Sequence, residues 1–210
     1  MGIGTDAKQP LRRDRARIAP RITRPDVNLA QLDRLFGAIA RAEKVNDFVV
    51  IGSLSVLGLL RERDVPEQML VSIDVDAWVE PDPPRAFDFN QAWGQGSAFE
   101  REHGYYFDPV SPHLPTLPDD WKSRLLALTL PSGARVKFLD PNDAAVSKYA
   151  RCDPKDRAWI REGLKQSILS LATIEYRFGE TPFLDSNEQS RAKSALEEDR
   201  QWLALIYQPQ

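Results

Sequence analysis

The sequence predicts an α/β fold, in which a mixed sheet flanked by helices is followed by a C-terminal helical part. Apolar residues recur at three- and four-residue spacing over residues 28–45, which is typical of an amphipathic helix. Residues 47–51 and 71–80 have the β-branched or alternating pattern of strands. From Asp140 onward the pattern is helical, and two Asp-Pro pairs mark helix starts.

The first half of the chain alternates helices and strands. After the helix over 28–45, the buried strand 47–51 ends at Gly52, and apolar residues over 53–63 favour another helix. Residues 71–80 alternate strictly and form the clearest predicted strand. Its polar face carries Ser72, Asp74, Asp76, Trp78 and Glu80.

The rest of the chain moves from short mixed elements to helices. The predicted elements are two helical pieces over 87–102, a strand over 104–110, a hairpin of 125–130 with 134–139, and helices over 141–150, 154–170 and 187–207. We therefore divide the chain into a basic arm (1–25), an α/β core (26–139) and a helical region packed on that core (140–210).

Composition excludes several classes of site. One cysteine, Cys152, cannot form a disulfide within the chain, and with only His103 and His113 beside it a four-ligand zinc site is not expected. Any metal is therefore expected to have oxygen ligands, as magnesium, manganese and calcium do. No 18-residue apolar run exists, and no apolar stretch follows the first charges, so we expect a cytoplasmic protein without a membrane span.

The net charge of -3 is unevenly distributed. Residues 1–25 contain seven basic and two acidic residues, or +5, so residues 26–210 carry -8. Two interpretations of the arm remain open: a solvated tail, or a segment that contacts the phosphates of RNA or DNA.

Two short motifs have the residue types of a phosphate and metal site. Asp74 and Asp76 point the same way on their strand, about 6.6 Å apart along the chain, so Mg²⁺ (or Mn²⁺) would relieve their repulsion. The alternative is the solvated face of an edge strand. Gly52-Ser53 stands between a strand and a helix, where backbone N–H groups and the Ser53 and Ser55 hydroxyls suit phosphate; the alternative is a serine that caps the helix.

This layout resembles the nucleotidyltransferase superfamily related to DNA polymerase beta. In that family Gly-Ser grips the nucleoside triphosphate, two aspartates bind the metals, and a third carboxylate completes the site. Gly52-Ser53 and Asp74/Asp76 match, and Asp108 on the next strand is the candidate third acid, with an Asp-Pro turn as the other interpretation.

Further segments over roughly residues 30–170 resemble uncharacterised bacterial nucleotidyltransferases that include abortive-infection toxins of type IV toxin–antitoxin pairs. These segments are Ser72-Ile73-Asp74-Val75-Asp76, Gly104-Tyr105-Tyr106, Leu117-Pro118 with Trp121 and Arg124, and Asp140-Pro141-Asn142-Asp143 followed by Lys148, Arg151, Lys155 and Asp156. Lys148 and Arg151 are the candidate phosphate contacts; a solvated helix lysine is the alternative for Lys148.

The resemblance implies transfer of a nucleoside monophosphate from an NTP to a hydroxyl of a protein, RNA or small molecule. It also implies Mg²⁺ dependence and, if the chain is a toxin, an antitoxin partner. Two alternatives remain: a non-catalytic module of the same fold acting through a protein partner, and an RNA-binding protein acting through its basic arm.

Overall fold

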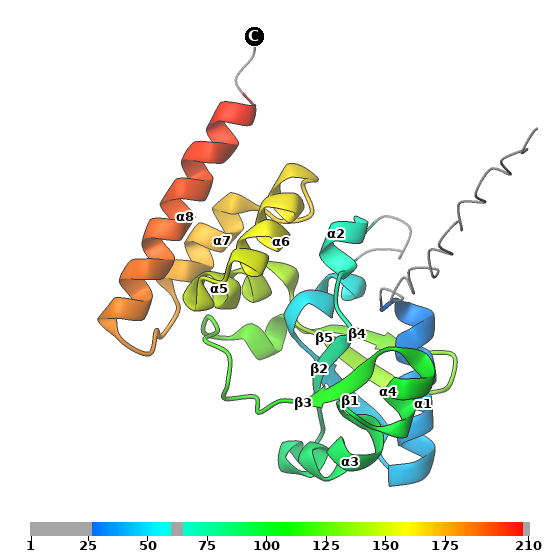
Figure 1. Ribbon diagram of the computed structural model, residues 1–210. Helices are drawn as coiled ribbons and strands as arrows, with labels where there is room; N and C mark the ends of the chain where they lie inside the picture. Colours follow the sequence, from blue (N-terminus) through cyan, green and yellow to red (C-terminus); the bar gives the residue numbers. More distant parts are fainter. Residues whose placement is uncertain (1–26, 60–64, 208–210) are drawn as a thin grey trace, which may run out of the picture.

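The computed structural model describes residues 27–59 and 65–207. Figure 1 shows two halves: a sheet with α1, α3 and α4 beside it, and a group formed by the helices α5 to α8. The predicted arm, residues 1–25, lies outside the described residues. Within the described ranges, no helix is both long and apolar enough to cross a membrane.

The five strands form one mixed sheet in the order β3-β2-β1-β5-β4. β1 pairs antiparallel with β2 and parallel with β5, whereas β2 and β3 are parallel. β4 and β5 form the predicted antiparallel hairpin. The strands are β1 (Asp47–Val50), β2 (Asp74–Val79), β3 (Tyr106–Pro109), β4 (Leu126–Thr129) and β5 (Arg135–Phe138). The α/β prediction is therefore confirmed.

The helices of the first half are short except for α1 (Leu29–Glu43). Asn28 caps α1, since its side chain accepts from Gln31 N–H while the Gln31 side chain accepts from Asn28 N–H. The other helices of this half are the 3₁₀ helix η1 (Gly52–Gly58), α2 (Glu67–Leu70), η3 (Pro83–Phe89), α3 (Asn90–Trp93), α4 (Ala98–His103) and η4 (Trp121–Arg124).

Three predicted bounds were wrong. The expected helix over 53–63 is a 3₁₀ helix that ends at Gly58, and residues 60–64 lie outside the described ranges. β2 begins only at Asp74, and Val71 is exposed. The helix expected over 154–170 ends at Lys165, because Ser167 takes a positive φ and Ser170 caps a separate helix.

The helical half consists of α5 (Pro141–Arg151), α6 (Pro154–Lys165), α7 (Leu171–Gly179) and α8 (Ser186–Ile206). Asp199 of α8 is fully buried, and it accepts a hydrogen bond from Tyr149 of α5 at 3.0 Å. It also pairs with Arg157 at 2.6 Å and Arg161 at 2.7 Å, both on α6. One carboxylate thus joins three helices.

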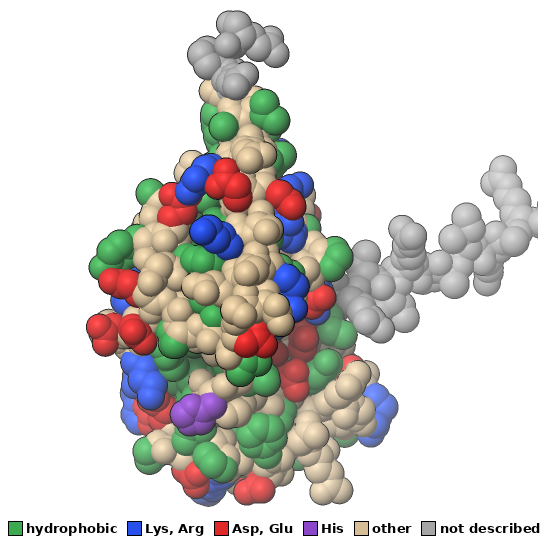
Figure 2. Space-filling view, turned by 90° about the vertical axis from the view of Figure 1, so that its left-hand side faces the viewer, with side chains coloured by type: hydrophobic (Ala, Val, Ile, Leu, Met, Phe, Trp, Pro, Cys, Tyr) green, Lys and Arg blue, Asp and Glu red, His purple; other side chains and the backbone are tan. Residues whose placement is uncertain are grey.

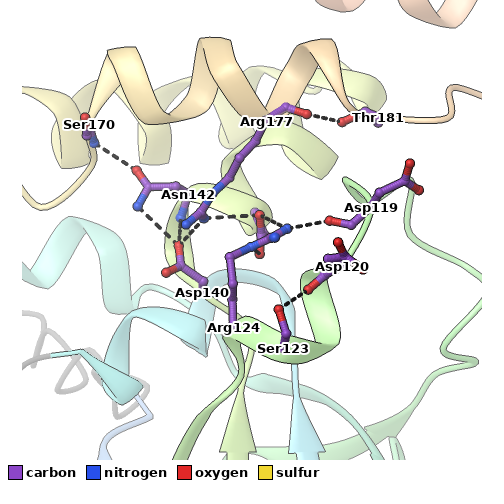
Figure 3. Close-up of polar contacts among 10 residues, drawn as sticks. Asp119, Asp120, Ser123, Arg124, Asp140, Asn142, Ser170, Arg177 and Thr181 are labelled. Atoms are coloured by element: carbon purple, nitrogen blue, oxygen red, sulfur yellow. Dashed lines mark hydrogen bonds and ion pairs between the residues drawn. The ribbon is translucent and has the colours of Figure 1, made fainter.

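A second ionic network fixes the start of α5 (Figure 3). Arg124, at the end of η4, donates two hydrogen bonds to the fully buried Asp143, at 2.9 and 3.1 Å. Arg177 of α7 pairs with Asp143 at 3.1 Å and with Asp140, the N-cap of α5, at 2.6 Å. Because η4 leads directly into β4, this network joins α5 to the sheet.

Candidate active site

Three aspartates meet on two adjacent parallel strands. Asp76 of β2 lies directly opposite Asp108 of β3, and Asp74 lies two residues before Asp76 on the same face. Each offers a carboxylate oxygen within 4.8 Å of the others. The strand pairing therefore brings together the pair expected to bind metal and the candidate third acid.

Like charges this close favour either protonation or a bound cation. Burial, followed by the charges of Asp74 and Asp108, raises the pKa of Asp76 to about 7. Burial also raises the pKa of Asp108, and Asp74 adds to that rise. Two ionised groups about 5 Å apart repel by roughly 3 kcal/mol at an effective dielectric constant near 20. A cluster of carboxylate oxygens has the ligand type of Mg²⁺ or Mn²⁺, so these residues fit a divalent metal.

The glycine that begins η1 lies against this cluster. Gly52 has a φ of +69°, and a Cβ at this position would overlap the Asp76 carboxylate. Ile51 N–H donates to the Asp76 carbonyl at 3.0 Å, which holds the end of β1 beside the acids. Both the backbone conformation and the space thus require glycine here.

A buried lysine extends the site from the helical half. Lys148 of α5 is only 3% exposed, and it donates to Ser53 Oγ at 3.0 Å and to Asp156 at 2.8 Å. Its ammonium lies 4.8 Å from the Trp159 ring centroid. Burial lowers the pKa of Lys148, an effect that the Asp156 charge opposes. Arg151 also pairs with Asp156, at 2.9 and 3.0 Å.

The chain matches the family model described as "Nucleotidyltransferase of unknown function (DUF6036)" over residues 27–206. This protein belongs to that nucleotidyltransferase family. The chain has no match among curated proteins or solved structures. The activity implied by the resemblance is thus confirmed at the level of the enzyme class, and the acidic cluster is consistent with metal-dependent catalysis.

The nucleotidyltransferase has a large polar cavity beside the aspartates. The cavity has a volume of about 690 Å³, which lies within the range of sites for nucleotide-sized ligands. Its walls include the three aspartates together with Ser53, Arg151, Lys155, Asp156 and Trp159. The aspartate cluster stands on the sheet side of the cavity, and the cations Arg151 and Lys155 come from α5 and α6, together with Asp156 of α6.

Ser55 is placed differently from the other predicted residues. It is fully buried, its Oγ has no hydrogen-bond partner among the described residues, and it lines neither this cavity nor the smaller one next to it. A phosphate-binding role for Ser55 stays a prediction.

Two residues that contact Lys148 were missing from the predicted site residues. Asp156 joins Lys148 to Arg151, and Trp159 packs on the lysine. Asp156 stands at the end of the motif that resembles the bacterial branch, which was the available signal. Nothing local marked Trp159, since a helix tryptophan is more often a core residue.

Proposed function

We propose that this nucleotidyltransferase transfers a nucleoside monophosphate from an NTP to a hydroxyl acceptor, with release of pyrophosphate. The observation that carries the proposal is the convergence of Asp74, Asp76 and Asp108 beside the Gly52-Ser53 turn. In this proposal the three aspartates hold Mg²⁺ or Mn²⁺, which neutralises charge on the phosphates when bound.

The remaining site residues are proposed to bind and orient the triphosphate. Arg151 presents its guanidinium to the cavity, where Asp156 fixes its direction. Lys148 donates to Ser53, which lines the large cavity, but Lys148 itself does not line it, so a direct phosphate contact by Lys148 stays a prediction. Ser53 Oγ accepts from the lysine, which leaves its own proton free for a phosphate oxygen.

Asp108 is proposed to complete the metal site, and a carboxylate of the cluster is proposed to receive the acceptor's proton. The position of Asp108 opposite Asp76 on the neighbouring strand places its carboxylate beside the other two aspartates, as a metal ligand or a base requires. A role as a toxin with an antitoxin partner rests on the resemblance of the motifs alone, and we retain it within the proposal.

The test is a set of isosteric changes at the cluster. Asp74→Asn and Asp108→Asn are each expected to weaken Mn²⁺ binding, measured by calorimetry, and to lower label transfer from α-³²P-NTPs at least 100-fold. Asp88→Asn is the matched control, because Asp88 is exposed on η3, outside the cluster. Full activity in Asp74→Asn would exclude this site.

A non-catalytic module is the second candidate, favoured by the burial of Lys148, which is paired with Asp156 and does not line the large cavity. A thermal-shift series of the four NTPs with Mg²⁺ separates the two. The absence of a shift with any NTP would support the module.

A further inference from the structure

A second, smaller cavity opens beside the aspartates. It has a volume of about 270 Å³, and it shares Asp76, Val110, Leu114 and Arg151 with the large polar cavity. Neither Asp74 nor Asp108 lines it. The two cavities therefore meet at a wall that includes one carboxylate of the cluster.

The smaller cavity is lined mainly by apolar side chains. It lies where the ends of β1 and β5, the loop after β3, α5 and the start of α8 come together. Its apolar walls are formed by Ile51, Val110, Leu114, Leu139, Ala144 and Ala150. Its one acid away from the cluster, Glu188, already accepts from Thr116 Oγ1 at 3.1 Å and from Leu184 N–H at 2.7 Å.

We propose that this smaller cavity binds the acceptor, and that the acceptor is a small alcohol or phenol with one compact apolar group. The proposal rests on the nucleotidyl transfer proposed above. A triphosphate carries about four negative charges, so it belongs with the metal ligands and cations of the large cavity. The apolar cavity is left for the other substrate.

The shared wall gives the geometry that the reaction needs. The acceptor oxygen must approach the α-phosphorus roughly in line with the departing pyrophosphate, hence from a direction that the triphosphate does not occupy. A hydroxyl held at the Asp76 end of the smaller cavity has that access. The new bond joins the acceptor oxygen to the α-phosphorus, the bond to pyrophosphate breaks, and the hydroxyl proton passes to a carboxylate of the cluster.

Size and charge favour a small molecule over nucleic acid. A cavity of about 270 Å³ falls below the usual range for drug-sized ligands, so it suits a group the size of one side chain. Residues 26–210 carry -8. On the face drawn in Figure 2, acidic and basic side chains are interspersed, and there is no continuous basic patch of the kind that binds a phosphate backbone.

The experiment compares acceptors with α-³²P-NTPs and Mn²⁺. Benzyl alcohol and p-cresol are expected to accept label at least tenfold faster than glycerol at equal concentration, and bacterial RNA is expected to remain unlabelled. Glycerol accepting as fast as p-cresol, or label entering RNA, would overturn the proposal.

A matched pair of variants locates the acceptor. Ala144→Leu fills the smaller cavity and should raise the KM for p-cresol at least tenfold, with the NTP thermal shift unchanged. Ala158→Leu makes the same change in the large cavity and should weaken the NTP shift instead. Because Ala144 is buried, Pro115→Asn is a second probe that should also raise this KM, since Pro115 is on the loop after β3 and lines only the smaller of the two cavities. An unchanged KM in both refutes the assignment.

These measurements distinguish a failure of the acceptor assignment from a failure of the nucleotidyl transfer on which it rests. If no NTP shifts the melting temperature with Mn²⁺, nucleotidyl transfer fails and the acceptor assignment fails with it. If an NTP binds and label is transferred without preference for apolar acceptors, only the acceptor assignment fails.

Discussion

The buried pair of Lys148 and Asp156 gives a prediction that separates folding from nucleotide binding. The change is Asp156→Asn, which keeps the shape of the side chain and removes its charge. Both side chains of the pair are at most 3% exposed, and their atoms approach to 2.8 Å. The lysine would lose its anionic hydrogen-bond partner and keep only neutral ones, the Ser53 hydroxyl and the new amide oxygen, beside the face of Trp159.

The magnitude follows from burial. Removing one partner of a buried ion pair costs about 3–5 kcal/mol, which for a chain of this size is roughly 6–20 °C in melting temperature. Arg151 adds little to this loss because its side chain is 51% exposed and solvent screens it. Asp153→Asn is the matched control, since Asp153 is exposed, makes no capping hydrogen bond, and should cost at most about 0.5 kcal/mol.

The pH dependence identifies the cause. The pKa of Lys148 is already lowered by burial, and Asp156→Asn removes a charge that raises it. The folded variant then loses its lysine proton before the unfolded chain does, so its free energy of unfolding should rise between pH 7 and pH 9. Urea unfolding at both pH values measures this. The double variant Lys148→Met with Asp156→Leu should recover most of the stability and still bind NTP weakly. A loss below about 1 kcal/mol with no pH dependence would refute the reasoning.

Three further outcomes follow from the same contacts. Without metal, the raised pKa of Asp76 means that the folded protein keeps a proton that the unfolded chain releases. The free energy of unfolding, measured with urea in EDTA, should therefore fall by up to about 4 kcal/mol between pH 4 and pH 8. Mn²⁺ should remove this pH dependence. Gly52→Ala should lower the free energy of unfolding by about 1–2 kcal/mol because of its positive φ, and it should also weaken Mn²⁺ binding. Gly96→Ala is the control: Gly96 has a φ of +79° with open space around it, so only the stability loss is expected. Asp199→Asn should cost about 1.5–3 kcal/mol in urea unfolding and leave the KM for NTP unchanged, because its partners are structural.

The sequence predicted elements and motifs well because both are local properties. Asp74 and Asp76 were assigned to one strand face from alternation alone, and Gly52 to a turn from its position between a strand and a helix. The parallel pairing of β2 with β3 sets Asp108 opposite Asp76. These two residues are 32 positions apart in the sequence, and no pattern within either strand specifies the pairing. Alternation also placed Trp78 with the acids, but it is 2% exposed and packs edge-on against Trp121.

Burial of charge was the other property that sequence could not supply. A helix lysine followed eight residues later by an aspartate usually lies in solvent, and only the packing of α5, α6 and Trp159 removes Lys148 and Asp156 from water. The same limit applies to Ser167, whose positive φ ends α6 although serine has no special preference for that conformation.

The formal charges around the large cavity argue for a cation as part of the working site. The aspartate cluster contributes three negative charges, and the Lys148–Asp156–Arg151 group opposite it has a formal charge of +1. Lys155 and Glu162, which also line the cavity, cancel. The protein alone thus presents about two negative charges to a ligand that is itself an anion. One divalent cation at the aspartates cancels these two negative charges, so metal and NTP should bind cooperatively, each weakly without the other.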